Sequence, residues 1–141
     1  MSFTNISVGI GAVSAGLLFV TGSIIPPLPP ITVHSLTYDA GVVHQERTVE
    51  VDPPAVVFWA QWRAEVIDAT TDAPVPGCVG SGSWNYEAGY KVVDIPIGEW
   101  VGQPITCTPD ILPDRFYLRA SWYWGEDQTS AESAVYEGAA E

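Results

Sequence analysis

The chain has 141 residues, of which 17 are acidic and 5 are basic, and its formal net charge at pH 7 is −12. This charge excludes nucleic acid as a partner, because phosphates would be repelled at every approach, and it disfavours docking of the charged part on anionic lipid. The length allows one core of single-domain size, and the 13 glycines and 12 prolines, scattered along the chain, favour short strands over helices.

The distribution of charge divides the chain into an uncharged arm and an acidic body. No Asp, Glu, Lys or Arg precedes Asp39, and the segment 6–25 is almost wholly apolar. The prolines of 26–30 would end any helix and form a stiff, extended spacer. We therefore predict an apolar, helical anchoring arm over 1–25, a polyproline spacer over 26–30, a β-sandwich domain over 31–137 and a loose tail over 138–141.

Three interpretations of the arm are open. A cleaved signal peptide would need a basic n-region, which residues 1–5 lack. A transmembrane helix fits the length of 6–25, but no Lys or Arg before Arg47 sets its orientation. In the third interpretation other protein chains bury the arm, because six apolar side chains follow the 4-3-4-3-4 spacing of a coiled-coil seam. These anchoring and assembly residues are Ile6, Ile10, Val13, Leu17, Val20 and Ile24.

The seam also indicates an oligomeric state. Isoleucine and valine at both seam positions favour three or more helices, so we expect a homo-oligomer, in particular a trimer. The expected partners of residues 1–25 are sister chains or other proteins of a larger assembly, with a lipid bilayer as the alternative.

The body predicts about seven short strands separated by turn signals. In 55–67 the apolar face is formed by Val56, Phe58, Ala60, Trp62, Ala64 and Val66, opposite Gln61, Arg63 and Glu65. The expected strands are 31–38, 42–51, 55–67, 83–87, 90–97, 115–124 and 132–137. Between them we expect a flexible loop at 80–82, a helical turn at 98–102 that places Trp100 over the core, and a hairpin loop at 125–130.

Two cysteines, Cys78 and Cys107, are available for a disulfide. Paired, they would close a loop of about 30 residues and indicate assembly in an oxidising compartment. The alternative is two separate buried thiols, which behave as small hydrophobic side chains.

The hairpin 116–136, the strand around Trp62 and the turn-rich middle resemble bacterial and phage immunoglobulin-like domains over most of 31–137. The usual immunoglobulin disulfide joins facing strands, whereas Cys78 and Cys107 are expected in or near connections. The whole layout is also similar to short uncharacterised proteins of tailed phages of marine alphaproteobacteria. These resemblances imply a mainly β, immunoglobulin-like antiparallel sandwich and a role in the virion.

The sequence predicts no catalytic, cofactor or metal site. His34 and His44 are expected to fill strand positions, and no nucleophile elbow or phosphate-binding loop is present. Carboxylates in loops that could converge are possible calcium ligands, but their spacing is not that of an EF-hand. These carboxylates are Asp110, Asp114, Glu126 and Asp127.

An aromatic contact face is the remaining candidate site. Trp59 and Tyr123 are expected on the faces of their strands opposite the core, beside Gln61 and Arg119. We predict a non-enzymatic structural or adhesion protein, held by its arm at a virion surface or elsewhere outside the cytoplasm, as a decoration, spike or tail accessory. The alternatives are a signal-anchored periplasmic or surface domain in a membrane, and a carbohydrate-binding module.

Overall fold

The computed structural model describes residues 29–137 of the chain. The arm 1–25, the first part of the spacer and the tail 138–141 lie outside the described residues. The same holds for the predicted seam of Ile6, Ile10, Val13, Leu17, Val20 and Ile24.

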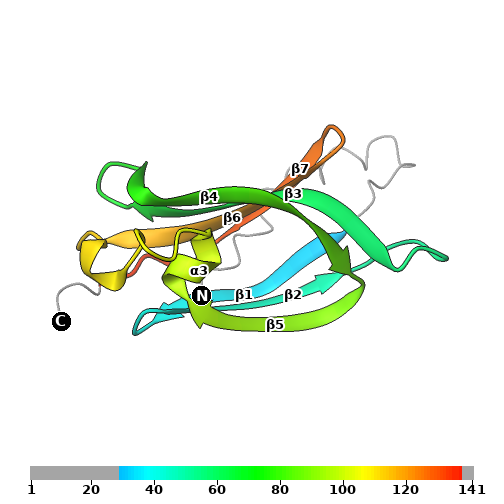
Figure 1. Ribbon diagram of the computed structural model, residues 1–141, viewed down its shortest axis with the longest axis horizontal. Helices are drawn as coiled ribbons and strands as arrows, with labels where there is room; N and C mark the ends of the chain where they lie inside the picture. Colours follow the sequence, from blue (N-terminus) through cyan, green and yellow to red (C-terminus); the bar gives the residue numbers. More distant parts are fainter. Residues whose placement is uncertain (1–28, 138–141) are drawn as a thin grey trace, which may run out of the picture.

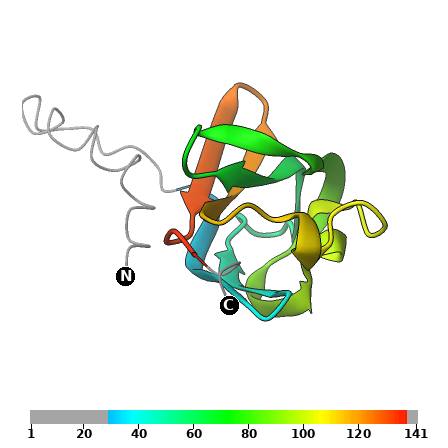
Figure 2. The ribbon, with the colours of Figure 1, turned by 90° about the vertical axis from the view of Figure 1, so that its left-hand side faces the viewer.

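The described residues form two antiparallel sheets that lie face to face (Figure 1, Figure 2). The three-stranded sheet has the order β1-β2-β5 and contains β1 (Ile31–Asp39), β2 (Val42–Val49) and β5 (Gly89–Pro96). The four-stranded sheet has the order β4-β3-β6-β7 and contains β3 (Val57–Asp68), β4 (Ala73–Glu87), β6 (Phe116–Trp124) and β7 (Asp127–Glu132). Two short helices, α3 (Ile97–Val101) and η3 (Pro109–Ile111), lie in the connection from β5 to β6.

The chain passes between the sheets three times, from β2 to β3, from β4 to β5 and from β5 to β6. Strands of one sheet are therefore not all neighbours in sequence, as in immunoglobulin-like sandwiches. The predicted mainly β, immunoglobulin-like antiparallel sandwich is confirmed for the residues that the structure describes.

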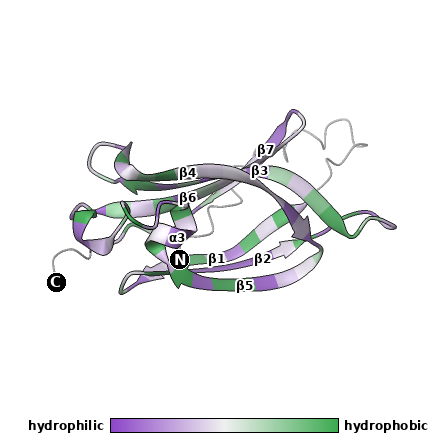
Figure 3. Cartoon of the chain, in the orientation of Figure 1, coloured by the Kyte–Doolittle hydropathy of each residue, from purple (hydrophilic) through white to green (hydrophobic). Residues whose placement is uncertain are grey.

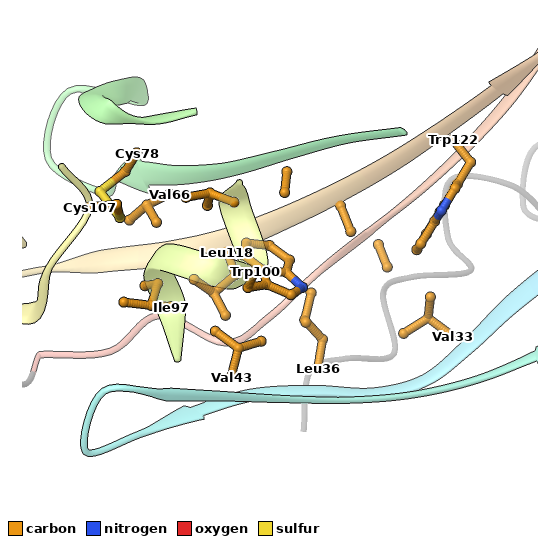
Figure 4. Packing of buried hydrophobic residues seen from close by; sticks show 14 of the residues in the cluster. Val33, Leu36, Val43, Val66, Cys78, Ile97, Trp100, Cys107, Leu118 and Trp122 are labelled. Atoms are coloured by element: carbon orange, nitrogen blue, oxygen red, sulfur yellow. A yellow bond between two sulfur atoms is a disulfide. The ribbon is translucent and has the colours of Figure 1, made fainter. Parts of the chain in front are cut away.

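The core lies between the two sheets because apolar residues alternate with polar ones along the strands. Hydropathy alternates in this way along the first part of β1, where Ile31 and Val33 are buried, and a register shift between Val33 and Ser35 then brings Leu36 to the buried side (Figure 3). Leu36 and Val43 of one sheet meet Leu118 and Val66 of the other (Figure 4).

Helix α3 covers the side of the core between β4 and β5, the edge strands of the two sheets. Trp100 is 8% exposed and its indole Nε1 donates a hydrogen bond of 3.0 Å to the side-chain oxygen of the buried Gln45. The helix ends at Gly102, whose φ of 79° is left-handed and suits glycine. The predicted helical turn that places Trp100 over the core is thus confirmed (Figure 4).

The predicted disulfide is also confirmed. Cys78 and Cys107 are bonded, and both side chains are buried beside α3. Cys78 lies within β4, whereas Cys107 lies in the connection between α3 and η3. The bond therefore ties the edge strand of the four-stranded sheet to a long connection, and does not join facing strands.

The prediction of a flexible loop at 80–82 was wrong, because β4 continues unbroken from Ala73 to Glu87. Gly80 and Gly82 pair with Ala64 and Trp62 of β3. Glycine is needed here for space, since a Cβ at Gly80 would collide with the main-chain carbonyl of Val101. Strand β4 also contains prolines at positions 74 and 76, which are tolerated because β4 is an edge strand.

The last predicted strand was also misplaced. The hairpin after β6 is tight, since Trp124 pairs with Asp127 and leaves Gly125 and Glu126 as the loop. Gly125 has a φ of 58°, which a two-residue hairpin requires at this position. Strand β7 thus ends at Glu132. In the rest of the predicted strand, 133–137, the pairing is an isolated β-bridge between Tyr136 and Phe116.

Two side chains of 55–67 differ from the expected pattern. Val56 precedes β3 and is 69% exposed, so it does not join the core. Glu65, expected on the solvent side, is 5% exposed. Its carboxylate is contacted by Arg63 and Arg119, its neighbours on that face.

Candidate binding face

The outer face of the four-stranded sheet is the surface that points away from β1-β2-β5. It is built from the alternate residues of β3 that do not enter the core, and from their partners on β4, β6 and β7. Register places Ser83, Gln61, Tyr123 and Gln128 in one row across the four strands. Cross-strand neighbours in such a row are about 5 Å apart at Cβ, so their side chains meet.

A hollow opens at this row. Its lining combines an amide, an arginine, two serines and the ring of Tyr123, which are donors and acceptors next to apolar surface. The lining residues are Gln61, Trp62, Arg63, Ser81, Gly82, Ser83 and Tyr123. Trp59 lies two residues before Gln61 on the same side of β3, opposite Asn85, and is 52% exposed.

Three of the four residues predicted for the contact face thus lie close together. Gln61 and Tyr123 are direct cross-strand partners, and Trp59 is on the same side of β3 as Gln61. Arg119 lies further along β6, opposite Glu65. It is not among the residues that line the hollow.

Arg119 is held by carboxylates. Its Nε lies 3.0 Å from Glu132 Oε2, and its guanidinium lies 3.6 Å from Glu65 Oε1. Arg63 Nε also contacts Glu65, at 3.1 Å. Burial lowers the pKa of Arg119, but the hydrogen bond to Glu132 and the nearby negative charges outweigh it and raise the pKa. The network keeps Arg119 charged and fixes β3, β6 and β7 side by side.

Sequence reasoning placed Arg63 on the same side of its strand as Gln61, but missed Ser81 and Ser83 as members of this face. The two serines were assigned to a flexible loop and the start of a strand, because the neighbouring glycines indicated a turn. The signal was present in the alternation of Ser81, Ser83 and Asn85 with other residues, which has the period of a strand.

A second polar cluster lies on the outer face of the three-stranded sheet. His44 Nδ1 is 2.7 Å from Asp94 Oδ1, and its Nε2 is 2.7 Å from Glu46 Oε2. Tyr90 donates a hydrogen bond of 2.9 Å to the other oxygen of Glu46. Hydrogen bonds from His44 to Glu46, and then to Asp94, raise the pKa of His44, and the same bond lowers the pKa of Glu46.

The His44 cluster is an ion-pair arrangement. Both ring nitrogens face carboxylates, so the imidazolium form, which donates from both, satisfies them. His34 bonds instead to Thr48 Oγ1, at 2.7 Å. Neither histidine has the nucleophile-and-carboxylate pairing that a catalytic triad uses.

The acidic loop residues considered for calcium have other contacts or stand apart. Asp110 accepts a hydrogen bond from Thr108 Oγ1 at 2.6 Å, which lowers the pKa of Asp110. Glu126 and Asp127 lie at the turn between β6 and β7. Within 29–137, no group of three or more His, Cys, Asp or Glu is placed to hold a metal ion.

The disulfide indicates that the protein folds in an oxidising, extracytoplasmic environment. Among the helices in the described part of the chain, none is long and apolar enough to cross a membrane. A scan against models of known protein families matches none of them. A search of curated proteins likewise finds no significant match.

Proposed function

We propose that the protein is a non-enzymatic structural or adhesion protein that contacts a partner through the outer face of the four-stranded sheet. The observation that carries this proposal is the hollow at Gln61 and Tyr123 with the exposed Trp59 beside it. Tryptophan and tyrosine are enriched at interfaces because they bury much area at little entropic cost and keep a polar group for hydrogen bonding. A half-exposed tryptophan on a regular strand next to amide and hydroxyl groups fits such a contact.

The second part of the proposal concerns attachment. The chain enters the sandwich at Pro30, whose carbonyl accepts a hydrogen bond of 2.8 Å from the main-chain N–H of Glu50. Strand β1 starts at the next residue, directly after the proline spacer. Residues 1–25 attach the protein to sister chains or other proteins of a larger assembly, and the spacer holds the sandwich away from it. A phage virion, in which the protein is a decoration, spike or tail accessory, suits a disulfide-bonded immunoglobulin-like domain on an apolar arm.

Fractionation of the producing cells and their particles tests the attachment. The full-length chain should sediment with purified particles and resist detergent extraction. Recovery in the membrane fraction alone would overturn the virion assignment and favour the signal-anchored surface domain.

Surface variants test the contact face. Trp59→Ala and Gln61→Ala should lower the fraction of the full-length chain retained on the particle or on target cells after a salt wash. Ile105→Ala is the matched control, because Ile105 is 87% exposed and lies in the connection after α3. Equal retention of all three variants would count against this face.

A carbohydrate-binding module is the second candidate. The hollow supports it, because sugar rings stack on exposed aromatic rings while their hydroxyls bond to amide and hydroxyl groups like those of Gln61 and Ser83. A glycan array probed with the full-length chain and with Trp59→Ala decides it. Binding that is lost in the variant favours this function, and no binding by either chain removes it.

A further inference from the structure

Two cations of the described residues have no carboxylate partner. Arg63, Arg115 and Arg119 each form an ion pair with a glutamate. Among residues 29–137 no ion pair is formed by the other two basic side chains, Arg47 and Lys91. A chain with 17 acidic residues could have paired them, so their isolation needs a physical account.

The two cations lie directly opposite each other, as partners in the β2–β5 register. Both are on the side of the three-stranded sheet that faces the core. Gln45 and Val49, two residues before and after Arg47 on β2, are buried and point to the same side as Arg47, and Lys91 shares that side as its direct partner. Like charges opposite each other in a sheet repel and destabilise it. A bound anion would relieve this repulsion.

The site lies at the end of the sandwich where β4 passes into β5 (Figure 1). There the Arg47 guanidinium carbon lies 5.1 Å from the centre of the Tyr86 ring, which belongs to the facing sheet. Tyr86 is itself fixed, because its hydroxyl accepts a hydrogen bond of 3.1 Å from Trp122 Nε1. Arg47 is thus held at a defined place over an aromatic ring.

The guanidinium of Arg47 is incompletely satisfied. Its Nε is buried and has no hydrogen-bond partner. Burial lowers the pKa of Arg47, and the partial negative charge of Tyr86 opposes this only in part. The buried Nε itself is out of reach of a ligand, but a carboxylate on the terminal nitrogens of the guanidinium would supply the missing counter-charge.

An exposed aromatic ring precedes Tyr86, the residue that Arg47 contacts, on the same side of β4. Trp84 is two residues before Tyr86 on the same side of β4, so the two side chains are neighbours about 7 Å apart. Trp84 is 61% exposed, unlike Tyr86, which is buried. A flat, partly apolar ring that carries one carboxylate would cover Trp84 while its charge meets Arg47 and Lys91.

We propose that Arg47, Lys91 and Trp84 form a binding site for an acidic sugar, with its carboxylate on the two cations and its ring on the indole of Trp84. The net charge of −12 favours a singly charged sugar residue over a dense polyanion, which the rest of the surface would repel. The site shares no side chain with the hollow on the outer face of the four-stranded sheet. The test of this site is therefore independent of the proposed function.

The test is a titration of the ¹⁵N-labelled full-length chain, kept in a polyoxyethylene detergent that carries no sugar. D-glucuronate should shift the indole N–H signal of Trp84, which Trp84→Phe assigns by its loss, and the shift should saturate. D-glucose, the neutral counterpart, should bind about tenfold more weakly or not at all, because it lacks the charge-assisted hydrogen bonds.

Variants complete the test. Lys91→Gln, an exposed position where folding is not at risk, should weaken glucuronate binding about tenfold, and Arg47→Gln should do the same or more. Arg115→Gln removes a cation that Glu137 already holds, and should bind glucuronate like the unchanged chain. Equal binding by Lys91→Gln, or no shift with glucuronate, would overturn the site. If N-acetylglutamate bound as tightly as glucuronate, the site would not require a sugar ring. The ligand would then be a carboxylate of a peptide.

Discussion

Trp100 and Gln45 form a hydrogen bond of 3.0 Å inside the sandwich, between a helix and a strand that the sequence separates widely. Both side chains are buried, so each satisfies the polar group of the other away from water. Gln45→Leu leaves the indole N–H without an acceptor and should lower the free energy of unfolding by about 1–3 kcal/mol. Urea denaturation of the full-length chain measures this.

The reverse change controls that prediction. Trp100→Phe removes the donor and leaves the Gln45 amide unpaired, whereas the double variant removes both polar partners. The double variant should therefore lose less free energy of unfolding than the two single losses added together. Strict additivity would show that the bond contributes nothing to stability.

The Cys78–Cys107 bond should contribute mainly by restricting the unfolded chain. It closes a loop with a sequence separation of 29, for which the chain-entropy model gives about 3–4 kcal/mol. A Cys78→Ala, Cys107→Ala double variant should show this loss in urea denaturation. A reducing agent should lower the denaturation midpoint of the unchanged chain and leave that of the double variant unaltered. If the reductant lowered both equally, the loss would have a different origin.

Much of this fold follows from local patterns. The alternation over 55–67 and 115–124 predicted the central strands β3 and β6, because a strand with one covered face must alternate. The last part of β4 was predicted as the strand 83–87, but its first part, 73–82, escaped prediction, because its glycines and prolines, which usually mark turns, here serve close packing and an exposed edge. Local propensity gave way to tertiary context.

The sites were less predictable than the fold. Gln61 and Tyr123 could be assigned to one face from alternation alone, but their direct opposition depends on the β3–β6 register. The same holds for His44 and Asp94, which are 50 residues apart in sequence and meet through the β2–β5 register. No local pattern specifies which residues of two strands lie opposite each other, so paired charges remain hidden until strands are aligned.

His44 should make stability depend on pH near neutrality. Its pKa in the folded chain is raised above the ordinary value of 6.5, so its contribution is complete below that value and is lost as the pH rises through the raised pKa. The pKa of Glu46 is lowered from 4.5, so its contribution is complete above that value and is lost as the pH falls through the lowered pKa. The two together predict greatest stability of the cluster between about pH 4.5 and 6.5.

The measurement is the urea midpoint of the full-length chain from pH 5 to pH 9. The decline above pH 6.5 should shrink in His44→Gln, which cannot titrate. His34→Gln is the matched control, since His34 contacts Thr48 and no carboxylate, and it should keep the decline. An unchanged decline in His44→Gln would assign the pH dependence to other groups.

Glu65 and Glu132 share Arg119 but differ in burial, which makes them a matched pair. The side chain of Glu65 is 7% exposed and that of Glu132 is 45% exposed. Glu65→Ala removes a buried carboxylate that balances the positive charges of Arg63 and Arg119. It should lower the free energy of unfolding by about 2 kcal/mol. Glu132→Ala breaks an exposed pair and should cost less than about 1 kcal/mol. Equal losses in urea denaturation would contradict the role of burial.

Substitution of Gly80 should destabilise the fold, because there is no room for a side chain at this position. A Cβ there would meet the main-chain carbonyl of Val101, which belongs to α3 and cannot rotate away as a side chain could. Gly80→Ala should therefore displace α3 and lower the free energy of unfolding by about 1–3 kcal/mol, as overpacking does. Ser81→Ala, at the next and exposed position of β4, should change it by less than about 0.5 kcal/mol. Because α3 carries Trp100, the indole N–H signal of Trp100 should also shift in Gly80→Ala and stay in place in Ser81→Ala. A stable Gly80→Ala chain with an unchanged Trp100 signal would show that β4 and α3 are not in close contact.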